Sequence, residues 1–385
     1  MVAYSRQTPS LVFDKSGNLY GTTAFGGSQC GVGGGYGTVF ELSPKSNGNW
    51  SESILHAFNY TDGASPYSPV VFDARGSLYG MTTSGPLQGG TVFQLTAASG
   101  GTWRLSTLHA FADGMDGGCI PGGCGEVSFD NFGRLYGTTS GYGAHNDGVA
   151  FNLGPVSPFS WYELILHAFA GGSRDGSVPT RPLTFDASGD AYGTTFSGGT
   201  NDAGTVFQLT PNKQSFGWTE KVLYSFQGTP YGSATDGANP FFGVILDAAG
   251  NLYGATAYGG PSGAGTVFKL SPNQDGTWTE SVIYALKDEP DGAWPTRPTF
   301  DKATGNLYGT TYRGGAFGQG SVYKLAPSLG GQWTETILYS FIGLNDGGPP
   351  ADGVILDSIG NLYGTTSEGG AGGPEFGGVV WEITP

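Results

Sequence analysis

Six Asp-Gly segments carry the most regular set of carboxylates in the chain. Carboxylates gathered on one rim of a fold could bind a cation or sugar hydroxyls, and two of them about 5 to 10 Å apart could hydrolyse a glycosidic bond. The alternative is that each aspartate caps its own turn and the proline that follows begins the next strand. Because the motif recurs in six copies, we favour turn capping. The segments begin at Asp62, Asp116, Asp175, Asp236, Asp291 and Asp346.

Charged residues that break the repeat are more informative. Glu126 and Arg297 occupy equivalent positions before an inner strand, and Arg181 lies at nearly the same level. These charges could form a polar cluster at a channel mouth or an ordinary salt bridge between repeats, and we favour the salt bridge. Glu126 with Asp175 or Asp116 is the first carboxylate pair to inspect for glycosidase chemistry. The other copies have Ser10, Pro69, Pro182, Gly243 and Gly353 at this position.

The histidines fall into two groups. His56, His109 and His167 occupy a repeat position that tyrosine holds in later copies, so we expect an outer-strand packing role. They belong to three different repeats and cannot share one metal ion as a triad. His145, close to Asp147 in a loop, is a candidate acid or base. We assign no metal ligand and expect no cofactor, with calcium at the acidic loops left open.

Aromatic rings in the long loops suit a carbohydrate ligand, because the C–H faces of sugars stack on them. Trp294 is the best candidate, as the one tryptophan predicted to lie outside a strand. Tyr60, Tyr142, Tyr231, Tyr258 and Tyr312 lie in or beside similar loops. The predicted ligand-binding set is Glu126, Arg181, Arg297, Trp294, His145, Asp147, Asp175 and Asp291.

A tandem repeat must position these residues. Within one copy, Asp14–Gly17 has the Asp-x-x-Gly pattern of a type I turn, which joins two strands. Leu11–Phe13 precedes the turn, Leu19–Thr23 follows it, and a third strand at Gly37–Phe40 and a fourth from Trp50 complete an antiparallel meander. Seven copies are spaced by 55 to 61 residues and are marked by Tyr20, Tyr79, Tyr136, Tyr192, Tyr253, Tyr308 and Tyr363.

Seven such meanders predict an all-β fold, a seven-bladed β-propeller of four-stranded antiparallel blades. The seventh copy stops at Val379–Pro385, before a fourth strand, and Val2–Ser5 resembles Ile337–Ser340 of an outer strand. We therefore expect the N-terminal strand to complete the last blade. All 385 residues should form one domain, with repeats near 10–69, 70–124, 125–181, 182–242, 243–297, 298–352 and 353–385 plus 1–9.

Composition limits the partners. The chain has 16 basic and 31 acidic residues, a formal net charge of -15, which repels phosphate backbones and argues against nucleic acid. No stretch is long and apolar enough to span a bilayer, and Met1–Ser5 is too short and polar for a signal peptide. Cys119 and Cys124 share one loop and could form a disulfide in an oxidising compartment, whereas we read Cys30 as an idle thiol.

The repeat as a whole resembles a known family. Asp-x-x-Gly-Asn-Leu-Tyr-Gly-Thr-Thr, followed by Gly-Thr-Val-Phe-x-Leu-x-Pro and Trp-Thr-Glu-x-x-Leu-Tyr-x-Phe, is similar to the GloVer tandem repeat of "choice-of-anchor" bacterial surface proteins, and more distantly to NHL and kelch repeats. The resemblance implies a secreted or surface-anchored bacterial protein and brings no catalytic residues.

We expect a monomeric extracellular binding module for a glycan or protein, with a polysaccharide-active hydrolase or lyase as the alternative. No Gly-x-Ser-x-Gly elbow, P-loop or Rossmann fingerprint occurs in a suitable context.

Overall fold

The structure is a computed structural model. It describes residues 10–27, 35–112, 114–120, 124–157, 160–179, 181–212, 217–229, 236–370 and 377–385. Val2–Ser5, Cys30 and Tyr231 lie outside these ranges, so the predicted closing strand is outside the described residues. The chain divides into two compact units, Met1–Phe169 with Pro179–Pro182, and Ala170–Val178 with Leu183–Pro385.

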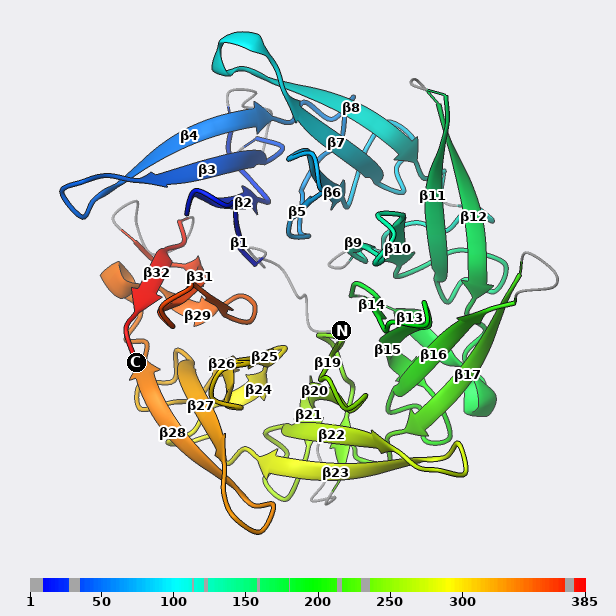
Figure 1. Cartoon of the computed structure of the whole chain (residues 1–385), viewed down its shortest axis with the longest axis vertical. Coiled ribbons are helices and arrows are strands. Elements are labelled where there is room, and N and C mark those ends of the chain that lie inside the picture. Colours follow the sequence, from blue (N-terminus) through cyan, green and yellow to red (C-terminus); the bar gives the residue numbers. More distant parts are fainter. Residues whose placement is uncertain are drawn as a thin grey trace. The chain divides into compact units, whose positions relative to one another are not determined.

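The first unit holds three four-stranded antiparallel sheets, each a meander in chain order (Figure 1). The first sheet contains β1 (Val12–Phe13), β2 (Leu19–Thr23), β3 (Thr38–Pro44) and β4 (Trp50–Ala57). The second contains β5 (Val71–Phe72), β6 (Leu78–Thr82), β7 (Thr91–Ala97) and β8 (Trp103–Ala110). The third contains β9 (Val127–Phe129), β10 (Leu135–Thr139), β11 (Val149–Ser157) and β12 (Ser160–Ala168).

The second unit holds four sheets of the same kind. The first contains β14 (Thr184–Phe185), β15 (Ala191–Gly198), β16 (Thr205–Pro211) and β17 (Trp218–Ser225). The second contains β19 (Val244–Leu246), β20 (Leu252–Thr256), β22 (Thr266–Pro272) and β23 (Trp278–Ala285). The third contains β25 (Thr299–Phe300), β26 (Leu307–Arg313), β27 (Ser321–Pro327) and β28 (Trp333–Ser340). The last sheet contains β30 (Ile355–Leu356), β31 (Leu362–Glu368) and β32 (Val380–Ile383).

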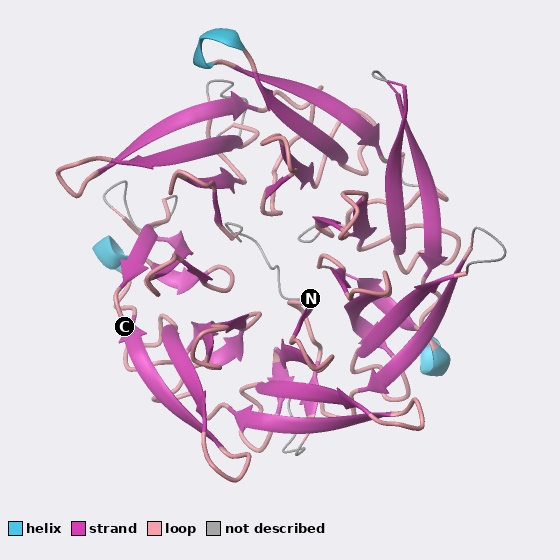
Figure 2. Ribbon diagram, in the orientation of Figure 1, coloured by secondary structure: helices cyan, strands magenta, loops and turns pink. Residues whose placement is uncertain are grey.

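Short strands from three Asp-Gly loops extend blade sheets of the second unit: β13 (Gly176–Pro179) pairs with β15, β24 (Ala293–Pro295) with β26, and β29 (Gly348–Pro350) with β31. In a fourth loop β18 (Gly237–Ala238) pairs with β21 (Tyr258–Gly259) as a separate two-stranded sheet. The seven sheets make the chain an all-β, seven-bladed β-propeller, as the repeat predicted. Figure 2 shows the strands with short helical turns between them; in the described residues these are the 3-10 turns Ser99–Gly101, Gly172–Arg174 and Leu344–Asp346. No described helix is long and apolar enough to cross a membrane.

Each inner hairpin is fixed by the aspartate of its turn. Asp247 Oδ1 accepts hydrogen bonds from the backbone amides of Ala249 and Asn251, at 2.8 and 2.9 Å, and Oδ2 accepts from Asn251 Nδ2 and the Tyr253 hydroxyl, at 2.7 and 3.2 Å. The repeat tyrosine therefore also holds the turn. Burial raises the pKa of the Asp247 carboxyl, but these hydrogen bonds outweigh it and keep the pKa below its usual value.

The repeat glycine after that tyrosine makes room for an aromatic ring on the next strand. A Cβ at Gly254 would lie 2.5 Å from Cζ of Phe268, and one at Gly21 would lie 2.7 Å from Cζ of Phe40. The Tyr-Gly pair of the motif is thus a packing requirement of each blade.

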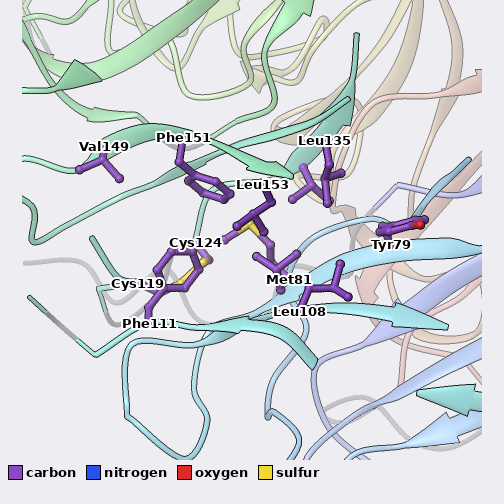
Figure 3. Close-up of a cluster of buried hydrophobic side chains, with 12 residues drawn as sticks. Tyr79, Met81, Leu108, Phe111, Cys119, Cys124, Leu135, Val149, Phe151 and Leu153 are labelled. Carbon is purple, nitrogen blue, oxygen red and sulfur yellow. A yellow bond between two sulfur atoms is a disulfide. The ribbon is translucent and has the colours of Figure 1, made fainter. Parts of the chain in front are cut away.

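Apolar cores lie between neighbouring sheets. One core joins the second and third sheets of the first unit and includes Met81, Phe111 and Phe151, all fully buried (Figure 3). A disulfide links Cys119 to Cys124 within it, as the sequence allowed. Aromatic and aliphatic side chains of adjacent blades thus bury apolar surface against one another within each unit.

Candidate functional site

The Asp-Gly aspartates cap their own loops, the alternative that the sequence analysis favoured. Asp175 Oδ2 accepts from the amide of Ala170 at 2.8 Å and Oδ1 from that of Gly176 at 2.6 Å. Asp236 accepts in the same way from Gln227 and Gly237, both at 2.7 Å. Asp175 and Asp236 are therefore held by amides of their own loops.

The histidine or tyrosine near the end of each outer strand contacts the loop aspartate that follows it. His56 Nε2 lies 3.0 Å from Asp62 Oδ2, and the Tyr339 hydroxyl donates to Asp346 Oδ2 at 2.9 Å. His56, His109 and His167 lie on β4, β8 and β12, the outer strands where we expected them. Their role there is polar as well as packing.

In several blades a glutamate on the next outer strand lies beside the histidine or tyrosine and its loop aspartate. Burial, followed by the charge of Asp116, raises the pKa of Glu163 to about 8. Burial, followed by the charge of Asp236, raises the pKa of Glu280 to about 7. Burial also raises the pKa of Glu335 to about 7. These carboxyl groups are thus partly protonated near neutral pH.

Tyr284 shows which hydrogen bonds a protonated glutamate makes possible. The Tyr284 hydroxyl lies 2.8 Å from Asp291 Oδ2 and 2.8 Å from Glu335 Oε2. A phenol has one proton to donate, so two ionised carboxylates would leave one contact without a hydrogen. When Glu335 is protonated, it donates to Tyr284, which donates to Asp291. Asp291, one of the predicted ligand-binding residues, is therefore engaged in a structural network and is 5% exposed.

Glu126 and Arg181 form a buried ion pair, the salt bridge between repeats that we favoured. Arg181 Nη1 donates to Glu126 Oε1, and the two side chains are 6% and 2% exposed. Glu126 precedes β9 of the third sheet, and Arg181 precedes the fourth repeat's inner strand. The carboxylate considered first for glycosidase chemistry is therefore neutralised by an arginine and shielded from water.

The remaining charged candidates, Arg297, His145 and Asp147, are not members of that ion pair. Arg297 is half-buried in the second unit and forms no ion pair with any residue that the structure describes. His145 is exposed on a turn in which Asn146 has a φ of 64°. Asp147 is half-buried, and its backbone forms an isolated β-bridge with Tyr142.

Trp294 is the centre of an aromatic cluster in the second unit. Its ring makes an edge contact with Tyr258, with centroids 5.4 Å apart, and stacks with Tyr312 at 5.9 Å and an interplanar angle of 19°. The Arg313 guanidinium carbon lies 4.1 Å from the Trp294 ring centroid. The three rings are half-buried and Arg313 is exposed. We call these four residues the Trp294 cluster.

Strand pairing explains this arrangement. Trp294 lies in the three-residue strand β24, whereas the sequence analysis placed it outside any strand. Ala293 is opposite Arg313 and Pro295 is opposite Thr311 on β26, so Trp294 is held beside Tyr312 and Arg313. Trp294 has a φ of 59°, and Ser65, Val178 and Asn239 share this left-handed conformation at the same repeat position. The backbone is thus set by the repeat, and the tryptophan is particular to this copy.

Sequence reasoning missed Arg313. Its repeat position is held by Ser197 in the fourth copy and Tyr258 in the fifth, so a copy-by-copy comparison would have marked it as a departure. The contact of Arg313 with Trp294 could not be predicted from this comparison, because it depends on the pairing of β24 with β26 and hence on the path of the loop.

The repeat is a recognised one. A family model described as the Gloeobacter/Verrucomicrobia repeat matches residues 6–235 and 229–385. The chain belongs to this family. No curated protein matches the sequence of this Gloeobacter/Verrucomicrobia repeat protein.

Solved structures similar to this Gloeobacter/Verrucomicrobia repeat protein include three proteins with named activities. A periplasmic gluconolactonase from Pseudomonas aeruginosa is 16% identical, with a TM-score of 0.51, and the match covers 86% of this chain and 84% of that one. An oxidoreductase described as a putative glucose dehydrogenase from Thermus thermophilus is 16% identical, with a TM-score of 0.45 and coverages of 98% and 96%. An α-L-arabinofuranosidase from Clostridium thermocellum is 15% identical, with a TM-score of 0.39 and coverages of 74% and 95%. At these identities the likeness concerns the fold alone.

Proposed function

We propose that this protein is an extracellular carbohydrate-binding module whose ligand rests on the Trp294 cluster. The observation that supports the proposal most is the exposed Arg313 guanidinium over the ring of Trp294, which itself contacts Tyr258 and Tyr312. Aromatic rings offer a platform to the C–H faces of a sugar, and a stacked guanidinium offers several fixed donors to its hydroxyls. A rigid β-scaffold that presents such groups near its loops is a common binding arrangement.

The charge of the protein supports a neutral ligand. With 31 acidic against 16 basic residues, the surface disfavours the approach of a polyanion. Neutral polysaccharides such as arabinan, arabinoxylan or β-glucan are therefore the first class to test. The family resemblance and the Cys119–Cys124 disulfide support an extracellular location, since disulfides persist in oxidising compartments.

Isothermal titration calorimetry of the full chain against arabinan, arabinoxylan, β-glucan and polygalacturonate tests the proposal, with a reducing-sugar assay in parallel. We expect binding to a neutral polysaccharide, without release of reducing ends, in EDTA as in calcium. Release of reducing ends would instead favour a hydrolase. Absence of binding to every neutral polysaccharide would overturn the proposal.

A variant locates the site. Trp294→Asn copies the residue that the fourth repeat has at this position, Asn239, which adopts a φ of 57°. Asparagine tolerates the left-handed conformation, so the variant should fold, with a slightly lower melting temperature because ring packing is lost, and bind at least tenfold more weakly. Equal binding by the variant and the wild type would contradict a role for Trp294.

A further inference from the structure

Three side chains that can bind a metal converge in the first unit. His109 comes from the end of β8, Asp116 from the loop that follows, and Glu163 from β12 of the next sheet. His109 Nε2 lies 3.4 Å from Asp116 Oδ2 and 3.8 Å from Glu163 Oε2. One ligand atom from each of the three residues lies within 4.8 Å of the others.

The group is not satisfied by hydrogen bonds of its own. His109 Nε2 and Glu163 Oε1 are buried atoms without a hydrogen-bond partner among the described residues. The Glu163 side chain is only 10% exposed. The ionised form of Glu163 would be a buried carboxylate without a donor, so a bound cation would stabilise that form.

Equivalent glutamates elsewhere also have a buried oxygen without a hydrogen-bond partner among the described residues, namely Oε1 of Glu280 and Oε1 of Glu335. In the first repeat His56 lies 3.0 Å from Asp62, and Leu105 occupies the position of Glu163. In the fifth repeat a tyrosine replaces the histidine, and Tyr284 contacts both Asp291 and Glu335 at 2.8 Å. Neither of these repeats combines an imidazole with two carboxylates as the second does, whereas by sequence the third has the same three residue types, His167, Asp175 and Glu220.

We propose that His109, Asp116 and Glu163 bind a divalent zinc ion through Nε2, Oδ2 and Oε2, with water as the fourth ligand. Tetrahedral zinc takes nitrogen and oxygen ligands at about 2.0 to 2.2 Å, which places neighbouring ligand atoms roughly 3.2 to 3.6 Å apart. The observed separations of 3.4 and 3.8 Å need little adjustment.

The ligand types favour zinc over calcium. Calcium takes six to eight oxygen ligands, whereas an imidazole nitrogen with two carboxylates suits a borderline-soft ion of low coordination number. The amide of Ala112 donates to Asp116 Oδ2 at 3.2 Å and orients that carboxylate, as outer-shell donors do in metal sites. The ion would join the outer strands of the second and third sheets, so its role is structural.

The test uses the purified full chain, stripped with EDTA and then titrated with zinc chloride, with calcium chloride as the contrasting ion. Two variants copy residues that the chain already has at these positions. Glu163→Leu copies Leu105, and His109→Tyr copies Tyr284, so both should fold. We expect each variant to bind one zinc equivalent fewer than the wild type, measured by elemental analysis after gel filtration, and calcium not to bind there.

Cobalt(II) provides an independent readout, because a four-coordinate site gives an intense visible absorption. The wild type should show this absorption, and each variant should lose the part that this site contributes. Zinc should also raise the melting temperature of the wild type more than that of Glu163→Leu. Equal zinc stoichiometry in the wild type and both variants, or an unchanged cobalt spectrum, would overturn the proposal.

Discussion

The guanidinium of Arg313 lies over the ring of Trp294, 4.1 Å from its centroid. The two residues come from paired strands, with Ala293 of β24 opposite Arg313 of β26. Arg313 is exposed, and its guanidinium carries five N–H donors. The carbohydrate proposal rests on this exposed cation beside half-buried aromatic rings.

Replacement of Arg313 by lysine should separate charge from shape. Arg313→Lys keeps the positive charge but loses the planar fork, so we expect affinity for the neutral polysaccharide to fall about fivefold, an effect of about 1 kcal/mol. Calorimetry measures the change, and Trp294 fluorescence reports the altered stacking. Exposed Arg174, on a 3-10 turn of the same unit, offers the control Arg174→Lys, which should bind as the wild type does.

Replacing one member of the Glu126–Arg181 pair should lower the free energy of unfolding more than expected from replacing both. Glu126→Gln leaves a buried arginine without its counter-charge and should lower the free energy of unfolding by about 3 kcal/mol. The double variant Glu126→Leu with Arg181→Met removes both charges and should lose less than the sum of the single variants. Urea denaturation measures each value. Strict additivity would show that the two side chains are not coupled.

The turn aspartate of an inner hairpin should dominate local stability. Asp247→Ala removes four hydrogen bonds and should lower the free energy of unfolding by about 2 kcal/mol at pH 7. Because the folded pKa of Asp247 lies below its usual value, this contribution is present above the unfolded pKa and is lost as the pH falls through the folded pKa. The difference between variant and wild type should therefore shrink in acid. Asp275→Ala, at a fully exposed turn, is the matched control and should have a much smaller effect.

Stability should also depend on Glu335 near neutral pH. Its folded pKa of about 7 lies above the unfolded value, so the folded state holds an extra proton between pH 4.5 and 7. Stability is fully present below pH 4.5 and declines as the pH rises through 7. In EDTA, the melting temperature of the wild type should fall by a few degrees across this range, and that of Glu335→Gln should fall less. A parallel decline in both proteins would assign the pH dependence to other groups.

The fold could be predicted from patterns within one repeat, whereas the candidate site depends on contacts between segments that lie apart in the sequence. The Asp-x-x-Gly turn and its tyrosine interact within ten residues, so the hairpins of all seven copies could be predicted. Trp294 was selected as the one tryptophan expected outside a strand, whereas the structure places it in β24. Its neighbour Arg313 and the approach of Glu163 to His109 depend on how a loop strand joins a sheet and how two sheets pack, which spacing alone does not encode. The closing role of Val2–Ser5 and the single-domain organisation stay predictions.

The self-contained hairpin has an evolutionary consequence. Since the hydrogen bonds between Asp247 and Tyr253 stay within one copy, a duplicated gene segment would carry every residue of this turn, although the Tyr253 ring also packs against Phe300 and Trp333 of the next copy. Such a chain can lengthen, shorten or exchange copies and then diversify the residue before each loop proline, as Ser65, Val178, Asn239 and Trp294 illustrate. Individual loop residues can thus change while the supporting framework is inherited unchanged.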